Sequence, residues 1–414
     1  MTVALSGRAS DVRVIGLISL AHGSSHFFHL VLPPMFPWLK EAFALSYAEL
    51  GLLMSIFFVV SCVVQAASGF LVDRIGARPV LFTGISLLVL ASLIYSQSNG
   101  YGMLIIGAVI AGCGNGIFHP VDYTLINHKV SPPNLPYAYS MHGVTGYLGW
   151  AAAPAFMVGI AQLSDWRIAF LAAAILEAII LVVLWMNRGQ LLDNVKERHE
   201  HSRSHAEHSG LLPESAFAFL KLPAVWLCWA FFFFSMASTS SLQSFAPSAL
   251  FNIYQVPLTL GSYYITLLAL GSAGGVLFGG FLAAKLQAPE KIVSSCLSIT
   301  VIMCLALATG FVSPGLIPII FFMLGFGYGV VAPSRDLLVK RATPQGVAGR
   351  VYGIVYSGID LGAAVGPFIF GMFMDAGLPK ALFALRYSNY SSFLQFLPFQ
   401  QRALPRPTRH RKIS

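Results

Sequence analysis

The chain has 414 residues, of which 56% are hydrophobic and only 10% are charged. A soluble domain carries about 25% charged residues, so most of this chain's surface cannot face water. The net charge of +9 at pH 7 could indicate nucleic-acid binding. The basic residues, however, lie in short segments between long apolar runs, which is how Lys and Arg orient membrane helices. We therefore expect a multi-pass membrane protein without a nucleic-acid partner.

Apolar runs of about 20 residues are long enough to cross a bilayer. They cross it as helices because no water is present there to form hydrogen bonds with the backbone N–H and C=O groups. The first run is not followed by the cleavage site of a signal peptide, so we expect a retained helix. The runs predict eleven clear transmembrane helices, in chain order over residues 14–38, 48–72, 79–97, 102–128, 136–162, 165–187, 223–250, 259–285, 292–312, 315–340 and 349–375.

A polar segment rich in His divides the chain into two similar halves. It predicts an N-terminal six-helix bundle at residues 1–187, a cytoplasmic linker at 188–222, a C-terminal bundle with five clear helices at 223–385 and a basic tail at 386–414. Glycines and prolines recur at an offset of 213 residues, which predicts a parallel repeat about an axis along the membrane normal. The matched positions are Gly112 and Gly325, Gly114 and Gly327, Gly116 and Gly329, Pro120 and Pro333, Gly149 and Gly362, and Pro154 and Pro367. Gly69 recurs at Gly280 with the register shifted by two residues.

A twelfth helix should follow Asp375, but the apolar segments there are short and Arg386 interrupts them. We expect helix 12 to be degenerate or missing. Either a poor twelfth segment crosses the membrane, or the C-terminus is aberrant, as a frameshift or truncation would make it. Both interpretations answer the same problem, which is that after eleven helices the basic tail would lie outside the cell, against the charge rule. We favour the second.

The distribution of Lys and Arg predicts the orientation. If the N-terminus is cytoplasmic, the external loops hold only Lys40, Arg167 and Lys380, and all other basic residues before the tail lie in cytoplasmic segments. Cytoplasmic loops of membrane proteins carry such an excess. We expect a bacterial cytoplasmic (inner) membrane protein with its N-terminus in the cytoplasm.

Residues 69–79 read Gly-Phe-Leu-Val-Asp-Arg-Ile-Gly-Ala-Arg-Pro and connect the second and third predicted helices. This segment resembles the signature loop of the major facilitator superfamily. The resemblance implies an all-α fold of two helical bundles and a secondary transporter. It also implies a gating latch, joined by an acid near the end of the fourth helix, whose ion pair breaks when the halves rock apart. The latch residues would be Gly69, Asp73, Arg74, Gly76, Arg78 and Asp122. The alternative is that Arg74 and Arg78 only enforce topology.

The first half also contains Ala21-His22-Gly23, a Leu-Ser-Tyr-Ala-Glu-Leu-Gly segment at residues 45–51, and Phe118-His119-Pro120. These features resemble fosmidomycin-resistance-like members of the superfamily. The pattern departs at Val121, where an acid would be expected directly after His-Pro, and Asp122 follows one place later. Residues 146–154 match the antiporter signature in part, which favours export.

Ionisable residues inside a bilayer are costly and are functional candidates by default. His22, His26 and His29 share one face of the first helix because they are four and three residues apart, and we expect this face to line the central cavity. Histidine can carry a proton near neutral pH. A carboxylate in the membrane, such as Asp360, either pairs with a cation or stays protonated. We expect proton coupling at His22, Asp360 and His119, and a substrate cavity lined by His26, His29, His142, Ser235, Thr239 and Gln243. The alternative for the histidines is an ordinary hydrogen bond between helices.

We expect no metal ion and no other cofactor. The linker histidines His199, His201, His205 and His208 have no fixed frame, and the pair His22 and His26 has no nearby carboxylate in the sequence. No Ser-His-Asp or metalloprotease pattern is present, so we do not expect an enzyme.

The combined interpretation is a secondary transporter, with proton-coupled export of a small organic molecule or drug by alternating access as the first choice. The alternatives are proton-linked uptake of an organic acid or other small nutrient, an inactive truncated transporter, and a membrane sensor that transports nothing. The expected partners are a small-molecule substrate, protons and the lipid bilayer, and we expect a monomer.

Overall fold

The computed structural model describes residues 2–192, 223–286, 289–342 and 348–384. All regular elements among these residues are helical, and eleven segments are long and apolar enough to cross a membrane. The helices are α1 (Thr2–His29), α2 (Phe36–Phe43), α3 (Tyr47–Ile75), α4 (Ala77–Ser96), α5 (Tyr101–Asn115), α6 (Phe118–Lys129), α7 (Leu135–Leu163), α8 (Trp166–Met186), α10 (Pro223–Tyr254), α11 (Leu258–Leu286), α12 (Pro289–Thr309), α13 (Ile317–Ala342) and α14 (Ala348–Asp375). Short 3-10 turns lie at Pro33–Met35, Pro132–Asn134 and Pro314–Leu316.

The eleven predicted spans are confirmed, but two of them are not single helices. The first is interrupted after His29, before the turn that begins at Pro33 and leads into α2. The fourth is divided into α5 and α6 at Gly116 and Ile117. The ring of a proline inside a helix clashes with the carbonyl four residues earlier, and that residue for Pro120 is Gly116. Pro120 therefore fits an interruption at this point, which is limited to two residues that both keep αR backbone angles.

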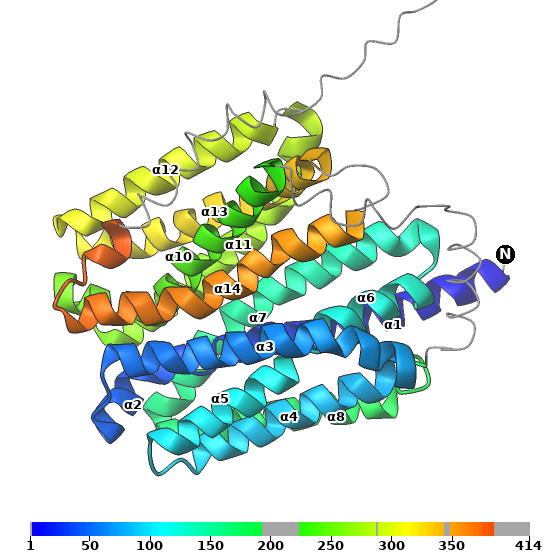
Figure 1. Cartoon of the computed structure of the whole chain (residues 1–414), viewed down its shortest axis with the longest axis horizontal. Helices are drawn as coiled ribbons and strands as arrows, with labels where there is room; N and C mark the ends of the chain where they lie inside the picture. Colours follow the sequence, from blue (N-terminus) through cyan, green and yellow to red (C-terminus); the bar gives the residue numbers. More distant parts are fainter. Residues whose placement is uncertain (1, 193–222, 287–288, 343–347, 385–414) are drawn as a thin grey trace, which may run out of the picture.

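Helices α1 to α8 lie together on one side of the molecule, and α10 to α14 lie on the other (Figure 1). Equivalent glycines pack the same helix pairs in each half, which confirms the predicted repeat. A methyl group at any of them would strike a backbone carbonyl of the partner helix. These contacts join Gly112 to Phe57, Gly116 to Ser61, Gly325 to Leu268, Gly329 to Ser272, Gly149 to Gly23, and Gly362 to Phe233.

Helix pairs α3 with α14 and α7 with α11 join the two halves. Their closest contacts gather toward the end of the bundle at which α3 begins and α7 ends, hereafter the far end. Here the Ser55 hydroxyl donates to the Ala364 carbonyl. The Thr266 hydroxyl donates to the Ala151 carbonyl at 2.9 Å. The opposite end, where α1 begins, is hereafter the near end.

A carboxylate from one half caps a helix of the other at the far end. The backbone N–H groups of Tyr47 and Ala48 donate to the two oxygens of Asp375, each at 2.8 Å. Ser46 and Glu49 complete a capping box at the same helix start. The first N–H groups of a helix have no acceptor inside that helix. Asp375, at the end of α14, supplies two such acceptors to α3.

The chain continues after α14 into a short helical segment at residues 381–384, where Leu382 and Phe383 are buried. The rest of the segment in which a degenerate twelfth helix was predicted lies outside the described residues. The linker histidines also lie outside them, as does most of the predicted linker.

Candidate functional site

A cluster of histidines lies in the middle of the first half, between α1, α6 and α7. Its centre is Asp122, which is fully buried on α6. One oxygen of this carboxylate, Oδ2, accepts a hydrogen bond from Nδ1 of His22 and another from Nε2 of His142, each at 3.1 Å. The imidazole rings of His22 and His142 stack at 3.4 Å between centroids. The other oxygen of Asp122, Oδ1, is buried without a partner.

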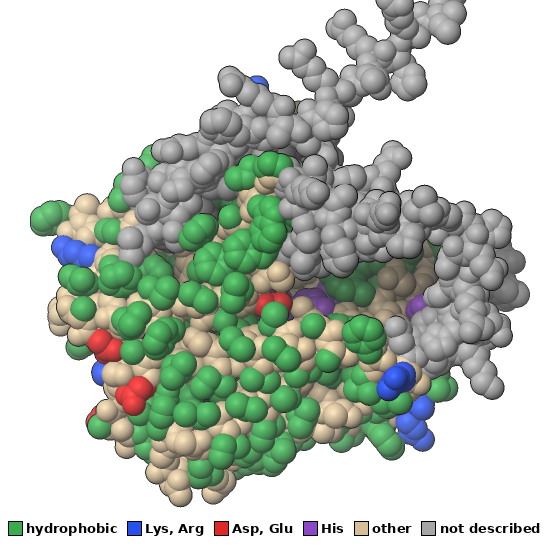
Figure 2. Space-filling model, viewed as in Figure 1, with side chains coloured by type: hydrophobic (Ala, Val, Ile, Leu, Met, Phe, Trp, Pro, Cys, Tyr) green, Lys and Arg blue, Asp and Glu red, His purple; other side chains and the backbone are tan. Residues whose placement is uncertain are grey.

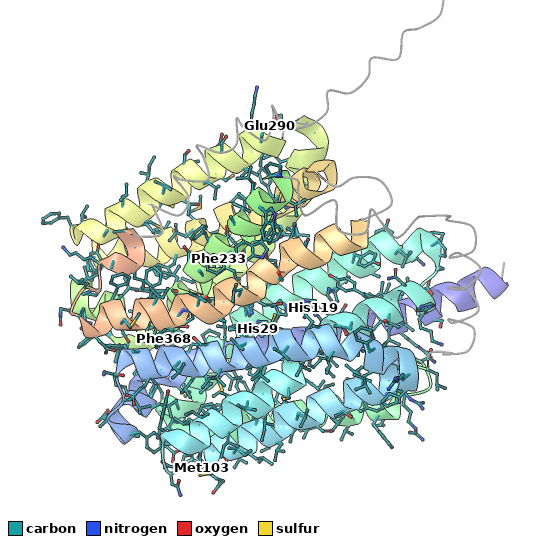
Figure 3. All side chains as sticks on the ribbon, in the orientation of Figure 1. His29, Met103, His119, Phe233, Glu290 and Phe368 are labelled. Carbon is teal, nitrogen blue, oxygen red and sulfur yellow. The ribbon has the colours of Figure 1, made fainter. Side chains whose placement is uncertain are left out.

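A chain of hydrogen bonds runs from this half to the other. Nδ1 of His119 lies 3.0 Å from the side-chain oxygen of Gln65 on α3. The amide nitrogen of Gln65 donates to Oδ2 of Asp360 on α14 at 3.2 Å. Asp360 and His119 are partly exposed although both lie within membrane spans. Figure 3 labels His119 among the helices of the first half.

His26 faces the same cluster but makes no hydrogen bond through Nδ1, which is buried. Its ring lies 4.4 Å from that of His22 and 4.7 Å from that of Trp150. A methyl group added at Gly146 would lie 2.9 Å from Nδ1 of His26 and 3.1 Å from Nε2 of His22. The missing side chain at Gly146 therefore leaves room for these two ring nitrogens.

His29 is held differently, because both of its ring nitrogens have partners. The indole N–H of Trp150 donates to Nδ1 at 3.2 Å, so this nitrogen carries no proton. Nε2 then donates to the side-chain oxygen of Asn115 at 3.0 Å. Asn115 is itself held by the hydroxyls of Ser25 and Ser61. His29 is a neutral, hydrogen-bonded histidine that joins α1 to α5 and α7.

The cavity residues predicted on the second half are not brought into hydrogen-bond contact with the histidines. Ser235, Thr239 and Gln243 are buried on α10, and the Thr239 hydroxyl donates to the Ser235 carbonyl of its own helix. The repeat instead places Arg335 where the first half has Asp122. The guanidinium of Arg335 lies 4.3 Å from the ring centroid of Phe232. Gly149 contacts Gly23 and its equivalent Gly362 contacts Phe233, so by helix packing Phe232 corresponds to His22. Equivalent positions therefore carry different chemistry.

The structure brings only part of the predicted latch together. Gly76 separates α3 from α4 with φ of 91° and ψ of 159°, a conformation almost restricted to glycine. Arg74 is exposed, Arg78 is partly buried, and a methyl group added at Gly69 would meet nothing within 4 Å. Asp122 does not join this loop: its carboxylate binds His22 and His142. In this structure Asp122 therefore belongs to the histidine cluster, and its role in the latch stays a prediction. The side chain of Asp73 lies outside the described part of the chain.

Sequence reasoning missed three residues that organise the site: Gln65, Asn115 and Trp150. Gln65 and Asn115 carried a usable signal, since each is an amide inside a predicted membrane helix, where unpaired polar groups are costly. Trp150 carried none, because an indole in a membrane helix is most often an apolar packing residue.

A recess between the two groups of helices exposes histidine and acidic side chains (Figure 2). Such a site between two repeats of a helical membrane protein is where secondary transporters bind their solutes.

Comparisons with known proteins agree with this architecture. The family profile of the Major Facilitator Superfamily matches residues 18–367. The fosmidomycin resistance protein of Escherichia coli (strain K12) is 22% identical over 358 residues, which cover 85% of each chain. The uncharacterized MFS-type transporter YfnC of Bacillus subtilis (strain 168) is 22% identical over 393 residues, covering 93% of this chain and 92% of YfnC.

Solved structures show the same fold. A bacterial homologue of the human lysosomal transporter Spinster, in an inward-facing and occupied conformation, superposes with a TM-score of 0.72 at 15% identity, covering 96% of this chain and 98% of the homologue. The peptide transporter POT in complex with sulfate superposes with a TM-score of 0.70 at 13% identity, covering 95% of this chain and 96% of POT. The residues matched, the eleven membrane spans and the glycine-packed repeat lead to one conclusion: this chain belongs to the major facilitator superfamily of membrane transporters.

Proposed function

We propose that this protein is a secondary transporter that exports a small organic molecule in exchange for protons, by alternating access. The observation that carries the proposal is the hydrogen-bonded bridge from Asp360 through Gln65 to His119. It joins the two halves that move relative to each other in this fold, and it contains a carboxylate within a membrane span.

The contacts between the halves support the alternating-access part. They are closest at the far end, through Ser55, Thr266 and the Asp375 cap. Toward the middle of the bundle, Asp360, His26 and His119 are partly exposed. A molecule that is closed at the far end and accessible from the near end corresponds to one of the two states that such a mechanism requires. By the distribution of Lys and Arg, the near end is cytoplasmic, so this state is inward-facing.

Asp360 is our first choice for the proton-coupling residue. It accepts a hydrogen bond from Gln65 and lies close to Cys62, both on α3 of the other half. None of the ion pairs between described residues includes Asp360. Asp360 lies at the interface between the two halves, so its environment differs between the two states. This difference links the protonation of its carboxylate to the conformation. The proposed roles of His22 and His119 as proton carriers stay predictions.

The signature loop supports a second, separate role in gating. Gly69 has open space around it here, although the superfamily pattern requires glycine. We infer that a neighbouring segment approaches Gly69 only in the alternative state, when the near end closes. Arg74 and Arg78 would form their latch contacts in that state.

Export is favoured by the likeness to the fosmidomycin resistance protein and by the partial antiporter signature. The proposal includes a bacterial inner-membrane location with a cytoplasmic N-terminus, the division at residues 188–222, and a monomer.

The test begins with growth inhibition of a host that lacks its own efflux pumps, over a panel of inhibitors that includes fosmidomycin. A compound to which the chain confers resistance is then used in inverted vesicles with an imposed pH gradient. Accumulation that requires the gradient, and that collapses with a protonophore, is the expected result for export. Uptake by cells driven by an inward proton gradient would instead favour the nutrient importer.

The decisive variant is Asp360→Asn, with Glu41→Gln as the matched control at an exposed acid. We expect Asp360→Asn to lose accumulation driven by the gradient while it still exchanges labelled for unlabelled substrate, since exchange requires no net proton movement. Full gradient-driven transport in Asp360→Asn would refute the assignment of the coupling residue.

A further inference from the structure

We propose that His22, His26 and His119 form a binding site for one divalent late first-row transition-metal ion, of the class of Zn²⁺, Ni²⁺ or Co²⁺, between α1 and α6 of the first half. This inference concerns binding and does not depend on the direction or coupling of transport.

The three imidazoles come from two helices and converge. Each offers one ring nitrogen, and these atoms lie within 4.8 Å of one another. In a tetrahedral zinc site with bonds of about 2.0–2.1 Å, ligand nitrogens lie roughly 3.3 Å apart. The ligand nitrogens must therefore draw together by up to about 1.5 Å when the ion binds.

The hydrogen bonds outside the cluster leave one ring nitrogen free on His22 and one on His119. Nδ1 of His22 donates to the carboxylate of Asp122, so its Nε2 keeps a lone pair. Because Gln65 uses its amide nitrogen on Asp360, its oxygen faces His119 and receives the proton of Nδ1, so Nε2 of His119 is also free. Histidine ligands in metal sites usually donate their second N–H to a carboxylate or carbonyl oxygen in this manner.

Two further observations point to a missing partner. Nδ1 of His26 and Oδ1 of Asp122 are both buried without a hydrogen bond. Nδ1 of His26 and Nε2 of His22 both border the space at Gly146. Buried polar atoms in native proteins are nearly always paired, and a cation between the rings would satisfy the imidazole nitrogen.

The expectation that no carboxylate is near His22 and His26 was wrong, because Asp122 is 100 residues from His22 in sequence but hydrogen-bonded to it in the fold.

The ligand chemistry selects the metal class. Imidazole nitrogens suit Zn²⁺, Ni²⁺, Co²⁺ and Cu²⁺, whereas Mg²⁺ and Ca²⁺ prefer oxygen ligands. The single carboxylate of Asp122 balances part of the charge. His29 is excluded from the site because both of its nitrogens are already used by Trp150 and Asn115.

The experiment uses the untagged full-length chain, purified in detergent, with the linker histidines His199, His201, His205 and His208 replaced by alanine so that they cannot contribute. Titration with Co²⁺ is followed by its visible absorption, and Zn²⁺ is then used to displace it. We expect one Co²⁺ per chain, nitrogen-type absorption bands, displacement by Zn²⁺ and no competition from Mg²⁺.

Two variants locate the site. His26→Ala should abolish saturable binding. Asp122→Asn, which keeps the shape of the side chain, should weaken binding by about 10–100-fold, as expected for a group that orients a ligand.

Two more variants guard against misfolding. Gly146→Ala removes no ligand but places a methyl group between His26 and His22, and should also weaken binding. His128→Ala, an exposed histidine on the same helix as His119, should leave binding unchanged. Elution volume and thermal stability are compared for every variant.

No binding by the parent chain, or equal affinity in His26→Ala and the parent, would overturn the proposal. Because no gradient is present in this measurement, its failure is distinct from a failure of the transport proposal.

Discussion

The cap that Asp375 places on α3 should set the balance between the two states of the transporter. The perturbation is Asp375→Asn, which keeps the size of the side chain. At present the carboxylate accepts from the backbone N–H groups of Tyr47 and Ala48, each at 2.8 Å. The two N–H groups use different oxygens of Asp375, and asparagine replaces one of these oxygens by an NH₂ donor, which leaves one N–H group facing a donor.

The magnitude follows from the exposure of the site. Asp375 is exposed, so water and salt reduce the strength of its bonds. A cap residue contributes about 0.5–2 kcal/mol, and a charge at a helix N-terminus contributes about 0.3–1 kcal/mol. We expect the far-end contact to weaken by about 1–2 kcal/mol, which changes the ratio of the two states by a factor of roughly 5–30.

The assay measures the distance distribution between two spin labels at the far end, in a variant without native cysteines. Leu163 at the end of α7 and Phe311 after α12 are 90% and 93% exposed, so labels there disturb no packing. Asp375→Asn should increase the population with a long distance, and high salt should have the same effect in the parent chain. The control is Glu41→Gln. An unchanged distribution in Asp375→Asn would show that the cap does not hold the far end closed.

Three other substitutions test the packing described above, each by thermal unfolding in detergent. Gly362→Ala should destabilise the chain by about 1–3 kcal/mol, because its methyl group strikes the backbone of α10. Gly159→Ala, with only one atom within 4 Å, should have little effect, and equal effects of the two would contradict the packing argument. Trp150→Phe should cost about 1 kcal/mol by leaving His29 with a buried, unpaired nitrogen, and an unchanged melting temperature would mean that this bond contributes nothing. Gly76→Ala should cost about 1–3 kcal/mol because its backbone conformation is almost restricted to glycine. Stability equal to that of the parent would show that the loop relaxes without strain.

Much of the fold could be predicted because lipid imposes a simple rule on the sequence. Every membrane span is an apolar run, and the glycine and proline pattern predicted the repeat that the helix packing confirms. The interruption before Pro33 was missed, since the apolar run continues through it.

Less of the site could be predicted, and the reason is geometric. His22, His26 and His29 are related by the period of one helix, so their common face follows from spacing alone. The positions of His119 and Asp122 relative to that face depend on the break between α5 and α6. The break rotates α6 about its axis relative to α5, and the angle of this rotation cannot be calculated from the spacing of residues in the sequence. The partner of Gln65 lies in the other half, 295 residues away, and no local pattern indicates it.

The placement of the imidazoles has a consequence for how this molecule can move. His22, His26, His29, His119 and His142 all belong to the first half, and Asp122 binds two of them there. The first half can thus rotate as a rigid body without separating any of these rings from its neighbours. Among the described residues of this network, the contact that must break is the hydrogen bond from Gln65 to Asp360. An amide can exchange one acceptor for another at little energetic cost, so the histidines would remain prearranged on whichever side of the membrane they face.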